Sequence, residues 1–151
     1  MGSNLTNEII ELLIRIPSTL RRTAHREFFK TALKQIGEDI TAQHLMIMRT
    51  LEESGPLHVS EIGSSLLISN SQMTHLTDKL ISLGLIERQP DYSDRRTIII
   101  ILTSNGEKTI RKVTGLIRNN IEAKLSAIPE EELETLSTSL KNIVNILAKI
   151  H

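Results

Sequence analysis

The sequence predicts a mainly α-helical fold that contains one small β-hairpin. Apolar residues recur at steps of three and four through most of the chain, which is the spacing of one face of a helix. The exception is a β-branched run from Thr97 to Thr103, which follows a polar turn and is the best strand candidate in the chain. A chain of 151 residues, 39% of them hydrophobic, is long enough for one domain with a core.

The most regular predicted helix follows Ser69, whose side-chain oxygen can accept a free backbone N–H of the first turn. Its apolar residues recur at steps of three, four and three: Met73, Leu76, Leu80 and Leu83. Gly84 comes next, and glycine best tolerates the left-handed conformation that ends many helices.

The face opposite this apolar stripe is polar. At about 100° per residue, it carries Ser71, Thr74, His75, Asp78 and Ser82, with Gln72 and Lys79 at its flanks. Such side chains suit the major groove of duplex DNA, where base edges offer donors and acceptors. The DNA-binding candidates on this helix are Ser69, Ser71, Gln72, Thr74, His75 and Lys79. The alternative is an ordinary solvated helix face.

A shorter helix is predicted just before it, from about Val59 to Leu66. Its inner face holds Val59, Ile62 and Leu66, and Gly63 marks a place where the two helices can approach closely. The connection between the helices is only about three residues long, which fits a helix-turn-helix. A generic pair of antiparallel helices would show a similar pattern.

The predicted hairpin has a strand from Leu85 to Gln89 that Pro90 ends, a polar turn, and the β-branched strand. Such a hairpin after a helix-turn-helix is the layout of a winged helix. Arg95 and Arg96 in the turn can enter a minor groove, where a narrow groove deepens the negative potential. Alternatively, they neutralise the two aspartates of the turn. We expect one arginine to brace the loop and the other to face DNA.

Taken together, these segments resemble the multiple-antibiotic-resistance regulator (MarR) family of bacterial and archaeal transcription factors. The matching residues are Gly55-Pro56-Leu57, Ser60-Glu61-Ile62, Ile68-Ser69, Met73-Thr74, Asp78-Lys79-Leu80, Gly84-Leu85-Ile86-Glu87-Arg88, Asp91 with Asp94-Arg95-Arg96, and Leu102-Thr103 with Gly106. The resemblance implies a winged-helix homodimer that binds a pseudo-palindromic operator, usually to repress.

Two residues depart from that family's pattern. His75 stands where the family more often has an arginine on the recognition helix, which weakens the expected contact and could make binding pH-dependent. His58 stands where a serine or threonine usually caps the preceding helix, so that helix's exact start is open.

The charge balance is unfavourable for DNA binding. Formal net charge is zero, and phosphate neutralisation usually supplies most of the affinity. Between positions 57 and 103 the bases are Lys79, Arg88, Arg95 and Arg96, against Glu61, Asp78, Glu87, Asp91 and Asp94. We therefore expect modest affinity with a shallow salt dependence per protomer. Only 2% of the residues are aromatic, which argues against single-strand binding by base stacking.

The flanking regions are predicted to be helical. Residues 4–37 carry an apolar stripe that Pro17 interrupts, so we expect a bend or break near Ile16. A further helix starts near Thr41, with Leu45, Met48 and Leu51 buried and Ala42 and Met46 beside them. Another begins at Thr103 or Ser104.

The last helix opens at Pro129, a favoured position for proline, and three glutamates in its first turn suit the helix dipole. Its apolar positions form a heptad-like seam: Leu133, Leu136, Leu140, Ile143, Leu147 and Ile150. With the resemblance, this predicts that residues 4–37 and 104–151 form a dimerisation region around a winged helix-turn-helix lobe of residues 38–103. The alternative is that the seam packs within one chain.

The resemblance also implies a pocket for a small lipophilic or phenolic effector, between the DNA-binding lobe and the dimer helices. Candidate lining residues are Phe28, Leu45, Met46, Met48 and Ile110. A ligand that prefers the non-binding spacing of the recognition helices would weaken DNA affinity by population shift.

Other classes of function find little support. The chain has no cysteine, so disulfides and thiol sensing are excluded. It has no apolar run near the ~20 residues of a membrane span and no secretion signal, so we expect a cytoplasmic protein. No two histidines lie three or four residues apart, so no metal site or other cofactor is predicted, and nothing indicates an enzyme. A rival is an interaction module or co-regulator with this fold but weak DNA binding.

Overall fold

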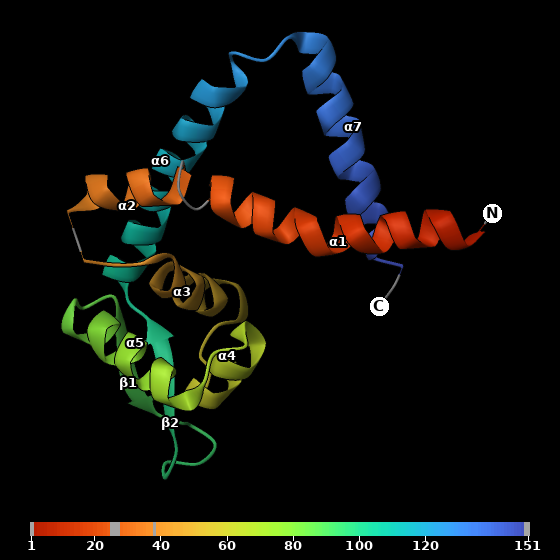
Figure 1. Ribbon diagram of the computed structural model, residues 1–151. Helices are drawn as coiled ribbons and strands as arrows, with labels where there is room; N and C mark the ends of the chain where they lie inside the picture. The colour runs from red at the N-terminus through yellow and green to blue at the C-terminus, as the bar shows by residue number, and fades with distance from the viewer. Residues whose placement is uncertain (1, 25–27, 38, 150–151) are drawn as a thin grey trace. The chain divides into compact units, whose positions relative to one another are not determined.

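The computed structural model describes residues 2–24, 28–37 and 39–149, with side chains from residue 4 and without those of residues 19–24. Its elements are α1 (Gly2–Ala24), α2 (Lys30–Ile36), α3 (Ala42–Ser54), α4 (Val59–Leu66), α5 (Asn70–Ser82), β1 (Ile86–Pro90), β2 (Ile98–Leu102), α6 (Ser104–Leu125) and α7 (Glu130–Leu147) (Figure 1). The predicted mainly α fold with one hairpin is confirmed. The chain divides into two compact units, residues 1–117 and 118–151.

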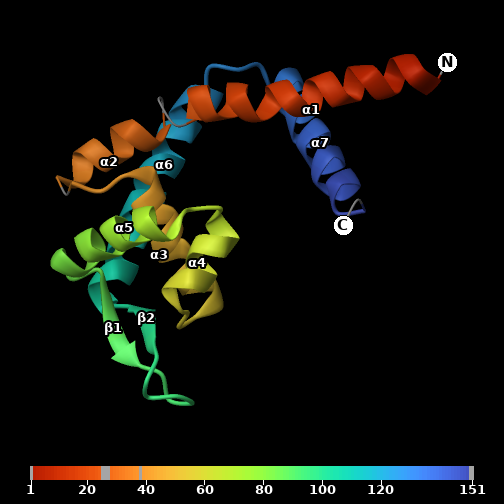
Figure 2. The ribbon, with the colours of Figure 1, turned by 60° about the horizontal axis from the view of Figure 1, so that its bottom comes forward.

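The winged lobe forms where α3, α4 and α5 pack against one another and against the hairpin. The apolar faces of these elements meet in a single core: Leu45, Ile47, Met48, Leu51, Ile62, Met73, Leu76, Leu80, Leu85, Ile86 and Ile100. The strands lie side by side, and the turn between them projects beyond the helices as a wing (Figure 2).

This core also takes in residues on either side of the predicted lobe. Leu33 of α2 and both Ile110 and Val113 of α6 are buried members of the same cluster. Because their apolar faces are covered by the lobe, α2 and the first half of α6 belong structurally to it. The sequence placed these residues in the flanking helical regions.

The hairpin is antiparallel, with its register running from Ile86 opposite Leu102 to Pro90 opposite Ile98. Leu57 adds a third, single-residue strand, because its N–H and C=O both pair with Ile100, at 3.2 and 2.8 Å. These paired groups fix the wing to the segment just before α4.

Helix α5 begins and ends where the sequence predicts. The Ser69 hydroxyl accepts the N–H of Gln72 at 3.4 Å, and Gly84 lies two residues beyond the helix with a φ of +67°. The left-handed φ costs glycine nothing, so the chain can turn sharply from α5 into β1.

Pro17 does not break the N-terminal helix, so of the bend or break predicted near Ile16 the break does not occur. Helix α1 continues from Gly2 to Ala24 with Pro17 inside it. The proline removes one donor, but Ser18 donates its hydroxyl to the carbonyl of Arg15 at 2.9 Å, which supplies a local side-chain partner in the same turn. The large apolar side chains of α1 that the structure describes are all exposed: Leu5, Ile9, Ile10, Leu12, Leu13, Ile14 and Ile16.

Helix α7 starts after Pro129, as predicted, and has no buried residue among those described. The predicted seam is exposed by between 40% and 50% at Leu136, Leu140, Ile143 and Leu147, whereas Leu133 is half-buried. Ile150, the last predicted seam position, lies outside the described residues. Within the described ranges, no helix is both long and apolar enough to span a membrane.

Candidate nucleic-acid interface

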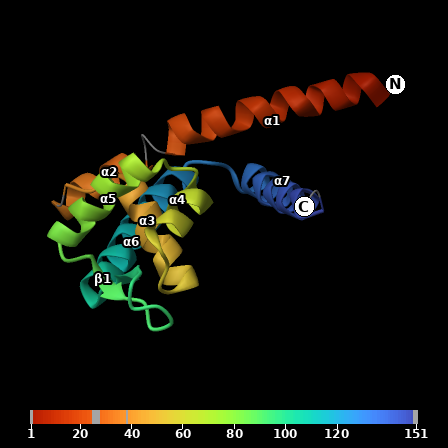
Figure 3. The same ribbon diagram turned by 90° about the horizontal axis from the view of Figure 1, so that it is seen from below.

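Helix α5 has one buried and one exposed face. Met73, Leu76, Thr77 and Leu80 are buried, whereas the predicted DNA-binding side chains Ser69, Ser71, Gln72, Thr74 and His75 are all exposed. Figure 3, seen from the wing side, shows α4, α5 and the wing together toward the viewer. The fold therefore presents a polar helix face beside a hairpin tip.

Two of the predicted DNA-binding residues already contact other parts of the lobe. Gln72 donates its side-chain amide to Gln43 of α3 at 3.2 Å. The Lys79 ammonium lies 3.2 Å from the carboxylate of Asp39, which precedes α3. Both contacts tie α5 to neighbouring segments, and the second partly offsets the charge of Lys79.

A third tether joins α5 to the wing. The Arg88 guanidinium on β1 lies 2.7 Å from the Asp78 carboxylate. The sequence did not predict this pair. The end of α5 and a turn lie between the two residues, so their distance in space does not follow from their separation along the chain. The bases left without an ion pair in the described contacts between positions 57 and 103 are Arg95 and Arg96.

The wing turn is organised by its two aspartates. One Asp91 oxygen accepts both the backbone N–H and the hydroxyl of Ser93, each at 2.8 Å. One Asp94 oxygen accepts the backbone N–H of Arg96 at 3.0 Å. The Ser93 donors, followed by the charge of His58, hold the pKa of Asp91 below its ordinary value. Carboxylates that cap free N–H groups in this way shape the turn.

The turn needs neither arginine side chain for these contacts. Across the described part of the chain, no ion pair joins the guanidinium of Arg95 or Arg96 to Asp91 or Asp94. The prediction that one arginine braces the loop is therefore wrong for the side chains, because the aspartates are satisfied by backbone N–H groups, Ser93 and His58. Both guanidinium groups are exposed.

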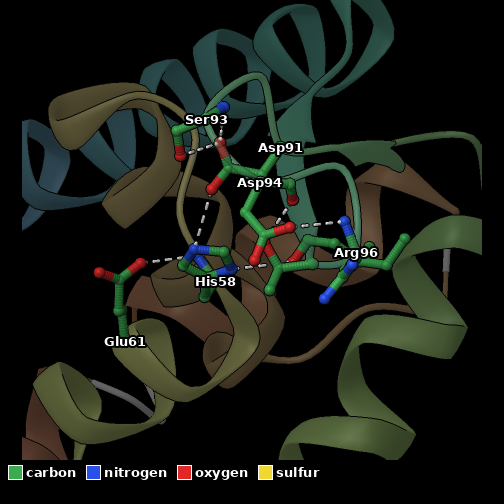
Figure 4. Close-up of polar contacts among 8 residues, drawn as sticks. His58, Glu61, Asp91, Ser93, Asp94 and Arg96 are labelled. Atoms are coloured by element: carbon green, nitrogen blue, oxygen red, sulfur yellow. Dashed lines mark hydrogen bonds and ion pairs between the residues drawn. The ribbon is translucent and has the colours of Figure 1, made fainter.

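His58 is the residue that braces the wing. Its backbone N–H donates to the Glu61 carboxylate at 2.7 Å, which is one half of a capping box, and α4 begins at Val59 as first predicted. Its ring lies between two wing atoms: Nδ1 is 3.0 Å from the Ile98 carbonyl oxygen and Nε2 is 3.2 Å from Asp91 Oδ2 (Figure 4). The departure from the family's pattern at His58 left the start of α4 open. In the structure, His58 is the N-cap and α4 starts at the next residue.

His44 is a second histidine with an unpredicted role. The backbone N–H of Thr41 donates to its Nδ1 at 2.9 Å, in the spacing of a capping box at the start of α3. The ring is 6% exposed and its Nε2 has no partner among the described contacts. Burial, then the charge of Lys79, lowers its pKa, and Asp39 opposes this. The sequence signal was the Thr41-x-x-His44 spacing.

No metal centre is apparent in the described ranges, which contain no group of three or more His, Asp or Glu side chains able to hold an ion. Glu38, six residues before His44 in the sequence, lies outside the described residues.

The predicted effector-binding residues fall into two groups. Leu45, Met48 and Ile110 are buried in the packed core, so a ligand could reach them only by displacing neighbouring side chains. Met46 is 48% exposed on α3 and Phe28 is half-buried. The structure does not bring the five residues to one surface.

These features define a winged helix-turn-helix protein of the DNA-binding class. The family model for the MarR family matches residues 40–98. The chain is 30% identical over 118 residues to the HTH-type transcriptional regulator YpoP of Bacillus subtilis, covering 76% of this chain and 84% of that protein. The chain belongs to the MarR family of transcriptional regulators.

Two further proteins extend the comparison. The HTH-type transcriptional regulator PecS of Dickeya dadantii is 31% identical over 144 residues, covering 91% of this chain and 82% of that protein. The fold matches a solved mutant of MarR from Escherichia coli complexed with operator DNA, with a TM-score of 0.65, 24% identity and coverage of 92% of this chain and 97% of that one.

Proposed function

We propose that this protein is a homodimeric, ligand-responsive repressor that binds a pseudo-palindromic duplex operator. The observation that carries the proposal is the exposed polar face of α5 beside two wing arginines that make no ion pair in the described structure. We assign base-edge contacts to Ser71, Gln72, Thr74 and His75, phosphate contacts to Ser69 and Lys79, and minor-groove contacts to Arg95 and Arg96. MarR of Escherichia coli, which has this fold, has been solved in complex with operator DNA, which supports DNA binding by the fold.

Exposed apolar helix faces support the dimer. Leu5, Ile9, Leu12 and Ile16 of α1 and the seam of α7 are large apolar side chains that one chain leaves in solvent. Such stripes are more stable when they pack against a second copy. A two-fold dimer would place two α5 helices about one DNA turn apart, ~34 Å.

The effector is the least constrained part of the proposal. We expect a small lipophilic or phenolic acid that prefers one spacing of the two α5 helices and so shifts the population between binding and non-binding forms. Of the five residues considered, Phe28 and Met46 are the ones with exposed surface, so they are the ones to substitute first. We place the protein in the cytoplasm, with its proposed operator.

One observation favours a second candidate function. Lys79 and Arg88 are both paired with aspartates, which leaves few free cations near α5 and the wing. A protein with this fold but weak DNA binding would act as an interaction module or co-regulator through its helical surfaces. The same binding experiment separates the two functions.

The experiment is fluorescence anisotropy with labelled duplex DNA from the protein's own upstream region, titrated with protein at several salt concentrations. The DNA-binding model predicts saturable, sequence-selective binding with one dimer per site. Binding that is weak and equal for an unrelated duplex would support the interaction module instead.

Substitutions then locate the interface. Arg96→Ala should weaken binding and lower the salt slope by about one, as expected for one lost phosphate contact. Lys112→Ala, which removes one exposed cation from α6, is the charge-matched control and should leave the slope unchanged. Equal effects from both variants would mean that the wing has no special role.

A further inference from the structure

The His58 ring touches the wing at both of its ends. Asp91 directly follows the last residue of β1, and Ile98 is the first residue of β2. The ring lies 3.2 Å from the first and 3.0 Å from the second, and it is half-buried at the N-terminus of α4 (Figure 4). The segment between these two contacts carries Arg95 and Arg96.

Both contacts can be hydrogen bonds at the same time only if the ring carries two protons. The Ile98 carbonyl can only accept, so Nδ1 must carry a hydrogen. An ionised Asp91 carboxylate can only accept too, and donors from Ser93 lower its pKa, which keeps it ionised where histidines titrate. Nε2 must therefore also carry a hydrogen. A neutral imidazole has one N–H and can donate to only one of the two partners.

We propose that His58 is a positioning residue for DNA binding: its imidazolium form holds both ends of the wing to the start of α4, and its neutral form releases one of them. Protonation thereby restrains the tip that carries Arg95 and Arg96. The consequence for DNA affinity rests on the proposed function, whereas the anchoring of the wing does not.

Some charges near the His58 ring favour its protonated form, and others oppose it. Asp91, which contacts the ring, and Glu61, whose carboxylate accepts the backbone N–H of His58, both favour the imidazolium. The positive end of the α4 dipole opposes it, as do Arg95 and Arg96 in the wing turn, whereas Asp94 favours it. Neither arginine contacts the ring in the described structure, whereas Asp91 does.

Tyr92 provides a readout that needs no DNA. It is the only tyrosine, the chain has no tryptophan, and its side chain is 90% exposed at the wing tip. Its intrinsic fluorescence anisotropy therefore reports the mobility of the tip in the free protein. We expect higher anisotropy near pH 5.5 than near pH 8, because histidine protonates between about pH 5 and 8. An anisotropy that does not change over this range would overturn the proposal.

Two substitutions make opposite predictions. His58→Asn keeps a favoured N-cap residue but cannot titrate, so the anisotropy should be low and independent of pH. In Asp91→Asn, the amide oxygen still accepts from Ser93 while its N–H₂ donates to a neutral Nε2, so both wing contacts survive at high pH. That variant should give high anisotropy near pH 8 and lower anisotropy near pH 5.5, because a protonated Nε2 can no longer accept from the amide. A wild-type pH profile in either variant would overturn the proposal.

His75→Gln is the matched control, because His75 is exposed on α5 and its loss should leave the Tyr92 profile unchanged. In this background, operator affinity should increase about two- to five-fold from pH 8 to pH 5.5, the scale of one partly exposed ion pair, and adding His58→Asn should abolish the increase. If Tyr92 responds as expected but the wild-type protein does not bind duplex DNA, the proposed function fails and the wing anchoring stands. An increase that persists without His58 would overturn the link to binding.

Discussion

The guanidinium of Arg88 on β1 lies 2.7 Å from the carboxylate of Asp78 on α5. The pair connects the wing to the helix face that we assign to the major groove. Both side chains are about half exposed, so water and salt screen the pair and its contribution to folding is small. Its larger effect is on the surface potential, because it places a negative charge on the proposed DNA-binding face and occupies one of the few nearby cations.

Asp78→Asn should therefore tighten DNA binding. The substitution removes the negative charge and releases Arg88 toward the phosphates, so the salt slope should become steeper by about one. The measurement is operator anisotropy at several salt concentrations. Stability should change little, since exposed pairs contribute about 0.2–1 kcal/mol.

The double variant Asp78→Asn/Arg88→Gln is the control for that prediction, because it removes the released cation as well. Its salt slope should return to the wild-type value. If the slope of the single variant is already unchanged, Arg88 does not reach the DNA.

The stability of the protein should fall as the pH drops below the ordinary histidine pKa, because of His44. Burial lowers its pKa in the folded state below the unfolded value of about 6.5, so the unfolded chain binds more protons between the two values. The stabilisation is complete above pH 6.5 and is lost as the pH falls toward the folded pKa. Protonation also places a hydrogen on the Nδ1 that accepts the Thr41 N–H.

His44→Gln isolates this effect, because glutamine at the same position can complete the capping box with Thr41 but cannot titrate. Urea unfolding between about pH 5 and 8 should show a shallower loss of stability in acid for the variant. Parallel curves for the two proteins would show that His44 is not the titrating group.

Gly106 should tolerate no side chain. A Cβ there would collide with the carbonyl oxygen of Leu85 and lie 2.6 Å from a methyl of Leu102. The backbone cannot give way easily, so Gly106→Ala should destabilise the fold by about 1–3 kcal/mol, measured by urea unfolding. Gly115→Ala on the same helix has nothing within 4 Å of its Cβ and should stabilise by about 0.5–1 kcal/mol. Equal effects would mean that α6 can move away from Leu85.

Leu140→Lys should produce a monomer, because it puts a charge on the exposed apolar seam of α7 where we expect a second copy to pack. Sedimentation equilibrium should show the lower mass, and operator affinity should fall because both half-sites can no longer be bound together. Thr138→Lys adds the same charge at another exposed position of α7 and should stay dimeric. A dimeric Leu140→Lys protein would place the interface elsewhere.

Local patterns in the sequence determined the elements and the family of this protein. The bounds of α4 and α5 follow from caps, apolar spacing and a left-handed glycine, all of which act within a few residues. Leu57 belongs to a segment that matches the family's motif. In the structure it forms the single-residue third strand of the wing. Of the bend or break expected at Pro17, the break did not occur, because α1 continues through the proline.

Only the tertiary structure decided which polar groups pair and which apolar groups are buried together. The contacts of Lys79 with Asp39 and of His58 with Asp91 join residues that are far apart along the chain. Leu33 and Ile110, which the sequence places in the flanking helices, pack into the core of the lobe for the same reason. Such pairings depend on how helices and strands pack, and no local spacing encodes them, because a side chain's neighbours are set by the whole fold.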